Sequence, residues 1–416
     1  MHSRLIDIEP AAPFADAKRR VATAVEAARA EILDLSHRIH ATPEPAFEEH
    51  RAAAWVAEVL ARHGYAVELP VGSLATAIRA TRRGERAAGG AAAGGAADSS
   101  PGPRIGILAE YDALPGLGHG CGHNTMAASG VGAAIALAAI ADELPGEIVF
   151  LGTPAEEHGS GKATMIAEGI FDGLDAALLY HPCDRNHVEI EALASEDVDV
   201  VFRGLQAHAA ADPWNGRNAL DAMIGLFSSV GLWRQQLRPD SRVHGIIREG
   251  GTAANIIPDR AAAWFMLRSP DRTYYAEMKT RFGNLCRAAA LATDTQVDVE
   301  YSGGATVMNN NLVLAERFRA NMGAYGIVDQ GHDPSYGSTD MANVSWVCPT
   351  IHPDLAIAPE GTPGHSILFR DAAASPAADA TTLLAATLVA QTAYELFVDP
   401  GLRDAAWAEF RASVTR

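Results

Sequence analysis

One stretch of the sequence indicates the fold: Ile105-Gly106-Ile107-Leu108-Ala109-Glu110-Tyr111-Asp112, an apolar run that ends in polar residues. Residues 147–152 and 176–180 form two further apolar runs, and each of them also ends in polar side chains. Continuous apolar strands separated by helices predict an α/β fold whose sheet is buried on both faces. In such sheets ligands bind at the carboxyl ends of the strands. The side chains that we expect at this edge are those of Asp112, Glu156, Glu157 and His181.

A glycine-rich loop follows the first of these strands, with the sequence Gly118-His119-Gly120-Cys121-Gly122-His123-Asn124. Glycine permits a sharp turn, so the thiolate of Cys121 and the imidazole of His123 can point at one place. Zinc and similar divalent ions accept both as ligands. Glu156 and Glu157 are adjacent, so one carboxylate can bind metal while the other acts as a general base on a water molecule. These residues, with His181 as a further ligand, indicate a metal hydrolase.

The composition is that of a globular protein of 416 residues, with 48% hydrophobic and 20% charged side chains. This length favours two domains. The formal net charge of -18 disfavours nucleic acid and an anionic membrane as partners. The first residues include acids where a signal peptide has an apolar region, and the four cysteines lie far apart without a pairing pattern. We therefore expect a cytoplasmic protein.

The order of the expected elements divides the chain into two domains. Residues 1–194 and 306–416 are expected to form a catalytic domain that begins with a helix from residue 15 to about residue 38. Residues 195–305 have the order β-α-β-β-α-β, which is that of a ferredoxin-like domain inserted into the first. The low-complexity stretch 86–103, rich in Ala and Gly, is expected to be a disordered loop without a role in the chemistry.

Several motifs together resemble a known family, the aminoacylase and amidohydrolase family of two-metal peptidases (peptidase family M20). The motifs, in family order, are Asp112-Ala113-Leu114-Pro115, the Cys-Gly-His loop, Pro154-Ala155-Glu156-Glu157, Gly204-Leu205-Gln206-Ala207-His208-Ala209-Ala210 and Gly364-His365-Ser366. The likeness is greatest to the branch of p-aminobenzoyl-glutamate hydrolase and the β-alanyl-dipeptide hydrolases. It implies a zinc-peptidase-like catalytic domain with a central, mostly parallel sheet flanked by helices. It also implies that the inserted domain is a lid and the dimerisation domain of a homodimer.

The resemblance gives each matching residue an implied role. Glu156 would be the general base and later the acid, and Asp112 would orient a ligand. His208 would reach the active site of a neighbouring subunit and stabilise the oxyanion there. Asn255 and Arg268 would contact the substrate, Arg268 through a carboxylate, which suits its planar guanidinium. The residues that would hold two divalent metal ions are Cys121, His123, Glu157, His181 and His365.

One departure from the family pattern concerns the metal. Many relatives have His-x-Asp and a bridging Asp, whereas this chain has Glu110-Tyr111-Asp112 and then Cys121-Gly122-His123. The next residue, Asn124, replaces an Asp as well. A thiolate ligand leaves Zn, Mn and Co all compatible with the site.

The sequence thus predicts an amidohydrolase that uses two metal ions and acts on N-acyl amino acids or dipeptide-like substrates with a free carboxylate. Candidates are p-aminobenzoyl-glutamate, β-alanyl or similar dipeptides, and N-acyl amino acids. Two rival interpretations stay open. One is a cysteine hydrolase with Cys121 as the nucleophile and His123 as its base. The other is a partner subunit without catalysis, in which bound metal contributes only stability.

Overall fold

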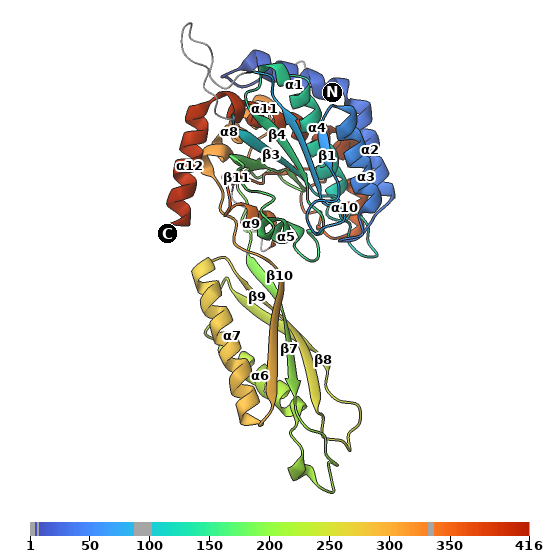
Figure 1. Ribbon diagram of the computed structural model, residues 1–416, viewed down its shortest axis with the longest axis vertical. Helices are drawn as coiled ribbons and strands as arrows, with labels where there is room; N and C mark the ends of the chain where they lie inside the picture. Colours follow the sequence, from blue (N-terminus) through green and yellow to red (C-terminus); the bar gives the residue numbers. More distant parts are fainter. Residues whose placement is uncertain (1–4, 6–7, 87–101, 332–336, 416) are drawn as a thin grey trace. The chain divides into compact units, whose positions relative to one another are not determined.

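The computed structural model describes residues 5, 8–86, 102–331 and 337–415, and the chain forms two compact units (Figure 1). The large unit is made of Met1–Ile190, Met308–Ser335 and Asp340–Arg416, and the inserted unit is mainly Glu191–Val307. The expected inserted domain, residues 195–305, lies inside this last range. Most of the stretch expected to be a disordered loop, residues 86–103, lies outside the described residues.

The large unit contains both halves of the chain. Its strands are β1 (Ala66–Glu68), β2 (Ile78–Arg83), β3 (Arg104–Ala109), β4 (Glu147–Gly152), β5 (Ala176–Leu178), β6 (His181–Cys183), β11 (Thr350–Ile351) and β12 (Asp354–Ala356). Its helices are α1 (Ala15–Ala27), α2 (Arg29–Ala41), α3 (His50–Arg62), α4 (His123–Ala138), α5 (Gly161–Ala167), α8 (Leu312–Ala324), α9 (Met341–Val344), α10 (Ile367–Ala372), α11 (Pro376–Val398) and α12 (Pro400–Val414). The single first helix expected from residue 15 is in fact two, because the chain leaves helical geometry at Ala28.

The central sheet has six strands in the order β1-β2-β4-β3-β5-β11. The pairs β4–β3, β3–β5 and β5–β11 are parallel, whereas β1–β2 and β2–β4 are antiparallel. The sheet is therefore mixed rather than mostly parallel, since β1 and β2 form an antiparallel edge. Its parallel part brings the ends of β3, β4, β5 and β11 to one edge. A separate pair, β6 and β12, continues from β5 and β11.

The core is built around α4, all of whose residues are buried. This helix contacts β3 and β4 as well as α2 and α11. Its small residues allow this close packing, because a Cβ at Gly130 would lie 2.9 Å from the carbonyl oxygen of Leu108. Among the described helices, α11 is long and apolar enough to cross a membrane, but 83% of its most apolar window is buried inside the protein. Such burial is what a core helix shows.

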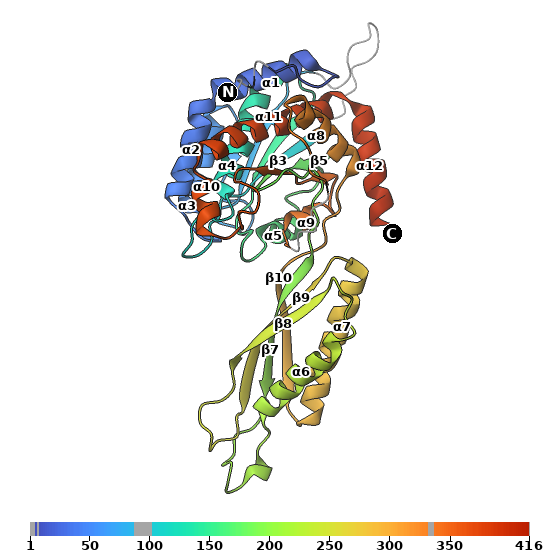
Figure 2. The same ribbon diagram turned by 180° about the vertical axis from the view of Figure 1, so that it is seen from behind.

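The inserted unit consists of β7 (Ala194–Arg203), α6 (Ala219–Arg234), β8 (Arg242–Glu249), β9 (Arg260–Ser269), α7 (Arg272–Ala292) and β10 (Gln296–Ala305). The four strands form an antiparallel sheet in the order β10-β7-β9-β8. Both helices pack on the same face of it, as Figures 1 and 2 show. Along β9 buried and half-buried side chains alternate strictly, since one face of the sheet packs against the helices. Its role as a lid or a dimer interface stays a prediction.

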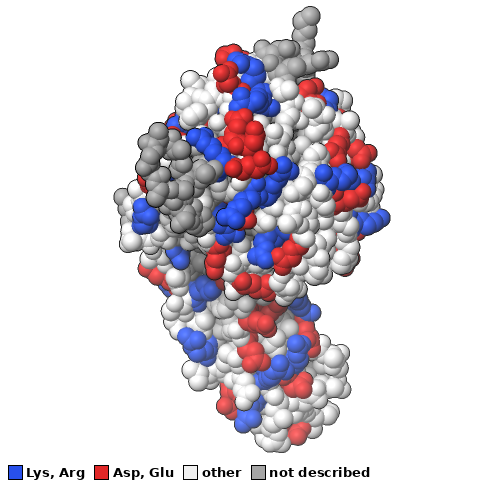
Figure 3. All heavy atoms as spheres, turned by 45° about the horizontal axis from the view of Figure 1, so that its top comes forward, with Lys and Arg blue, Asp and Glu red and all other residues white. Residues whose placement is uncertain are grey.

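Charged side chains of both signs are interspersed on the face of the molecule shown in Figure 3. Blue and red groups lie next to each other there, and several form ion pairs, such as Arg20 with Glu143 and Arg62 with Glu31. The excess of acids in the composition is thus not concentrated in one patch on this face.

Candidate metal centre

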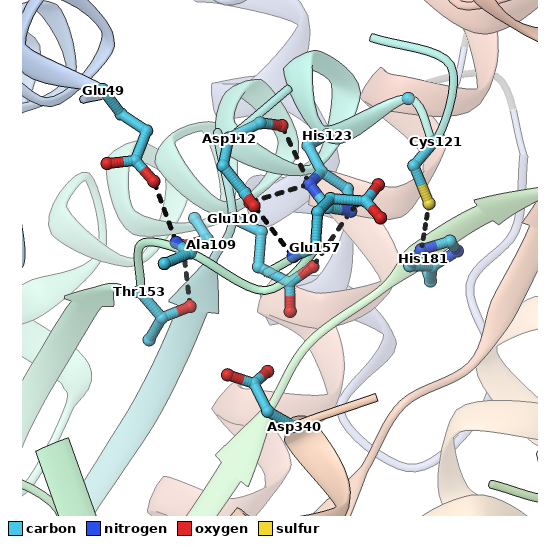
Figure 4. A network of polar contacts seen from close by, with 12 residues as sticks. Glu49, Ala109, Glu110, Asp112, Cys121, His123, Thr153, Glu157, His181 and Asp340 are labelled. Carbon is cyan, nitrogen blue, oxygen red and sulfur yellow. Dashed lines mark hydrogen bonds and ion pairs between the residues drawn. The ribbon is translucent and has the colours of Figure 1, made fainter. Parts of the chain in front are cut away.

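The candidate site forms where β3 and β4 end side by side. Thr153 follows β4 and donates both its backbone N–H and its hydroxyl to the carbonyl oxygen of Ala109, at 2.8 and 3.2 Å. This contact fixes the two strand ends to each other (Figure 4). Beyond them the chain places Glu110 and Asp112 on one side and the Glu156–Glu157 turn on the other. The expectation that polar strand ends share one edge of the sheet agrees with this geometry.

The loop between β3 and α4 brings Cys121 and His123 to the same edge. Gly122 between them has φ +80°, a left-handed conformation that glycine adopts without a steric penalty. A Cβ on this residue would lie only 2.7 Å from Cγ of Pro182, so the space as well as the conformation requires glycine. His123 is the first residue of α4 and is fully buried. Cys121 Sγ lies 3.5 Å from Nε2 of His181.

Asp112 fixes the orientation of two neighbouring groups. Its Oδ1 and its carbonyl oxygen both lie 3.0 Å from Nδ1 of His123, which therefore carries the proton and donates it. Its Oδ2 accepts a hydrogen bond of 2.9 Å from the backbone N–H of Glu157. Nε2 of His123 is then left with its lone pair free for a metal ion. A carboxylate that orients a ligating histidine in this way is common at metal sites.

The five expected ligands converge. Cys121, His123 and His181 offer ligand atoms within 4.8 Å of one another, and so do Cys121, Glu157 and His365. Cys121 belongs to both groups, which suits two ions that share it. The backbone N–H of His365 donates to the carbonyl oxygen of Gly120 at 3.0 Å and so joins the C-terminal loop to the Cys-Gly-His loop.

The donor set fits divalent cations. Nε2 of His123, Oε1 of Glu157 and Oε2 of Glu110 are buried and have no hydrogen-bond partner among the described residues. All three atoms can present lone pairs, so a cation among them satisfies each one. Two ligands on one tetrahedral zinc ion lie about 3.4–3.6 Å apart, given bond lengths of roughly 2.0–2.3 Å. The separations here are 3.5 Å between Cys121 Sγ and His181 Nε2 and 3.4 Å between Glu157 Oε2 and His365 Nε2.

Electrostatics at the site also favour a bound cation. Burial raises the pKa of Glu156 well above its usual value, and the nearby carboxylates of Glu110 and Glu157 raise it further. Burial lowers the pKa of His181 to about 3, and His123 beside it contributes, so His181 keeps its lone pair. For Asp112 burial opposes ionisation, but His123 outweighs it and lowers the pKa. Positive charge among these groups would stabilise the ionised carboxylates.

A buried ionic cluster at the same edge was not expected from the sequence. Lys162 Nζ lies 2.5 Å from Oε1 of Glu110 and 2.5 Å from Oδ1 of Asp340, and all three side chains are buried. Oε2 of Glu110 lies 3.3 Å from Nε2 of His123, and Glu110, His123 and Glu156 form a third group with metal-ligand spacing. The signal for Glu110 was its place at a strand end, whereas Lys162 at the start of α5 gave no signal.

Two further buried residues were also missed. His352 follows β11 at the same edge, and its ring lies 5.4 Å from that of His181. Glu49, just before α3, accepts a hydrogen bond of 2.9 Å from the backbone N–H of Ala155. The position of His352 at a strand end could have indicated it. Nothing in the sequence around Glu49 indicates a contact more than 100 residues along the chain.

The other three predicted site residues belong to the inserted unit. His208 is exposed, and its Nδ1 accepts hydrogen bonds from the N–H groups of Ala210 and Ala211, so its Nε2 carries the proton. Asn255 is exposed beside it, since its carbonyl oxygen accepts from the N–H of Ala209 at 3.0 Å. Arg268 lies half-buried in β9. Their proposed contacts with substrate stay predictions.

Comparison with known proteins gives a consistent result. Residues 106–386 match peptidase family M20/M25/M40. The Xaa-Arg dipeptidase of Mus musculus is 38% identical over 415 residues, 95% of this chain and 93% of the relative. One of the chains of p-aminobenzoyl-glutamate hydrolase from Escherichia coli is 28% identical over 92% of each sequence. A dinuclear metal-binding peptidase of the M20 family from Bacillus subtilis has a similar fold, with a TM-score of 0.65 and 19% identity over 89% of this chain and 99% of that one. The resemblance seen in the motifs is confirmed: the chain belongs to peptidase family M20/M25/M40 and is a hydrolase of peptide or other C–N bonds.

Proposed function

We propose that this hydrolase is a metal-dependent amidohydrolase that cleaves dipeptides or N-acyl amino acids with a free carboxylate on the amine side. The observation that carries the proposal is the convergence of Cys121, His123, Glu157, His181 and His365, with Glu156 beside them. The relative named Xaa-Arg dipeptidase, which is 38% identical over nearly the whole chain, favours dipeptides within this class.

The same five residues would hold two divalent ions, Zn or Mn with Co as an alternative. When bound, the ions supply Lewis-acid activation of water and of the amide carbonyl. Glu156 takes a proton from the attacking water, whose oxygen bonds to the carbonyl carbon. As the C–N bond breaks, Glu156 delivers that proton to the leaving nitrogen. Asp112 holds His123 in the tautomer that leaves Nε2 free.

The inserted unit would supply the remaining groups. We propose that His208 donates from Nε2 to the oxyanion in a neighbouring subunit of a homodimer. Asn255 would contact the substrate and Arg268 its carboxylate. The proposal includes a cytoplasmic location, which the scattered cysteines favour.

The test is a hydrolysis panel run with Mn2+ and with Zn2+. It should include Xaa-Arg and β-alanyl dipeptides, p-aminobenzoyl-glutamate and N-acyl amino acids, with release of the free amine as the readout. We expect cleavage of at least one dipeptide series, and loss of turnover in Glu156→Gln while two ions per chain are still bound. A Glu156→Gln variant with wild-type kcat would refute the assigned base.

The rival interpretations predict different results. A cysteine hydrolase would lose activity with iodoacetamide and keep it with a chelator. Its geometry is also poor, since both nitrogens of His123 face carboxylates and the imidazole near Cys121 is that of His181. A partner subunit without catalysis would bind metal and cleave nothing in the panel.

A further inference from the structure

The turn that carries Glu156 and Glu157 is conformationally strained. It joins β4 to α5, and two of its non-glycine residues have left-handed backbones, Ala155 with φ +60° and Ser160 with φ +55°. Such a conformation costs roughly 1–2 kcal/mol for a residue with a Cβ. Strained residues persist at functional sites only where the surrounding structure holds them. Ala155, directly before Glu156, therefore needs a contact that holds it in place.

Glu49 makes the direct contact. Its side chain is fully buried, and its Oε1 accepts hydrogen bonds of 2.9 Å from the N–H of Ala155 and of 2.9 Å from the N–H of Phe47 (Figure 4). Phe47 is itself left-handed, with φ +65°. The other oxygen, Oε2, accepts from the hydroxyl of Thr76 at 2.8 Å. One carboxylate thus joins two left-handed segments, with its own orientation fixed by Thr76.

The far side of Glu156 is held in the same manner. The N–H of Glu157 donates to Oδ2 of Asp112 at 2.9 Å. Glu156 therefore lies between two peptide N–H groups that each donate to a buried carboxylate, Glu49 before it and Asp112 after it. Because both neighbours are fixed, the direction in which the Glu156 side chain leaves the backbone is fixed as well. A shift of about 1 Å in a reacting group can cost on the order of 100-fold in rate.

We propose that Glu49 is a positioning residue for catalysis: by holding Ala155 in its left-handed conformation it sets the placement of Glu156 and of the ligand Glu157. This inference rests on the proposed role of Glu156 as the general base. Glu49 reaches the reaction only through the backbone of the turn, and no bond to substrate is assigned to it.

The experiment compares Glu49→Met, which removes both acceptor oxygens, with Glu49→Gln, which retains one. We expect kcat of Glu49→Met to fall about 10- to 100-fold, with KM changed less than threefold. In Glu49→Gln the amide oxygen can still accept from Ala155, so kcat should recover to within roughly threefold of wild type. A second readout needs no substrate: the visible absorption bands of the Co2+-substituted protein should shift in Glu49→Met, because the ligand Glu157 moves.

The matched control is Glu44→Met. Glu44 is a buried carboxylate five residues earlier that also accepts backbone N–H groups, those of Arg51 and Ala52, but does not touch the turn. Its loss should lower stability while leaving kcat and the Co2+ bands as in wild type. If Glu49→Met does not fold, Thr76→Val removes only the hydroxyl that orients the Glu49 carboxylate, and kcat should then fall roughly two- to tenfold.

The inference is overturned if the folded Glu49→Met variant, or Thr76→Val in its place, keeps the wild-type kcat and Co2+ spectrum. It is also overturned if Glu44→Met changes both to the same extent. The proposed function fails separately, through wild-type protein without hydrolysis or Glu156→Gln with full turnover. In the first of these cases the Co2+ spectrum still decides whether Glu49 fixes the turn.

Discussion

Replacing Gly122 by Ala should damage both stability and metal binding. The residue has φ +80°, and a Cβ there would lie 2.7 Å from Cγ of Pro182, well inside van der Waals contact. The left-handed conformation costs about 1–2 kcal/mol, and overpacking a tight site adds roughly 1–3 kcal/mol. We expect the free energy of unfolding to fall by about 2–5 kcal/mol in total. Pro182 directly follows His181, so relief of the clash would also move His181 away from Cys121.

Gly116→Ala is the matched control. Gly116 lies in the same loop and has a similar φ of +73°, but a Cβ there would meet no atom within 4 Å. It should therefore show only the conformational cost of about 1–2 kcal/mol. The difference between the two variants isolates the contact with Pro182.

Urea unfolding of the metal-free protein measures the first effect, and competition with a chromophoric zinc chelator measures the second. Gly122→Ala should lose zinc affinity at least tenfold, while Gly116→Ala keeps it. Equal stabilities for the two variants, or wild-type zinc affinity in Gly122→Ala, would refute the reasoning about this loop.

Three other predictions concern the same unit. Cys121→Ser should weaken zinc binding more than manganese binding in metal titrations, because the soft thiolate favours zinc; equal losses for both ions would contradict this. Burial lowers the pKa of His352 well below its usual value, so the unfolded chain takes up a proton below about pH 6.5 that the folded one does not, and stability falls with pH by up to 1.4 kcal/mol per unit. In urea unfolding at pH 7.0, 6.0 and 5.0, metal-free His352→Phe should show a shallower loss than wild type. Lys18→Met should cost about 3–5 kcal/mol, since it leaves the buried carboxylate of Glu395 without one of its cations, a loss that urea unfolding would reveal.

Much of the fold was predictable because its signals are local. Apolar runs that end in polar residues predicted β3, β4 and β5, and the order of elements from residue 194 to residue 305 matched the six elements of the inserted unit. The break at Ala28 and the antiparallel edge of β1 and β2 were not predicted. Both depend on how the segments pack against the rest of the unit, which the pattern of a single segment does not record.

The candidate ligands were also predictable from local features. Cys121 and His123 are two residues apart in a glycine-rich loop, and Glu156 and Glu157 follow a buried strand, so the chemistry they suit is visible in the sequence. His365 had no local signal of its own and was identified through the family motif. Family membership then gave a reason to treat these separate segments as one site.

The sequence by itself determined which strands end in polar side chains and which residue types could bind metal, because strand period and turn chemistry act over a few residues. Only the tertiary structure decided how the site is held. Lys162 meets Glu110 and Asp340 at separations of 52 and 178 residues, and Glu49 meets Ala155 at 106. Such contacts depend on where the folded chain returns in space, and buried charges must find partners there because water is absent.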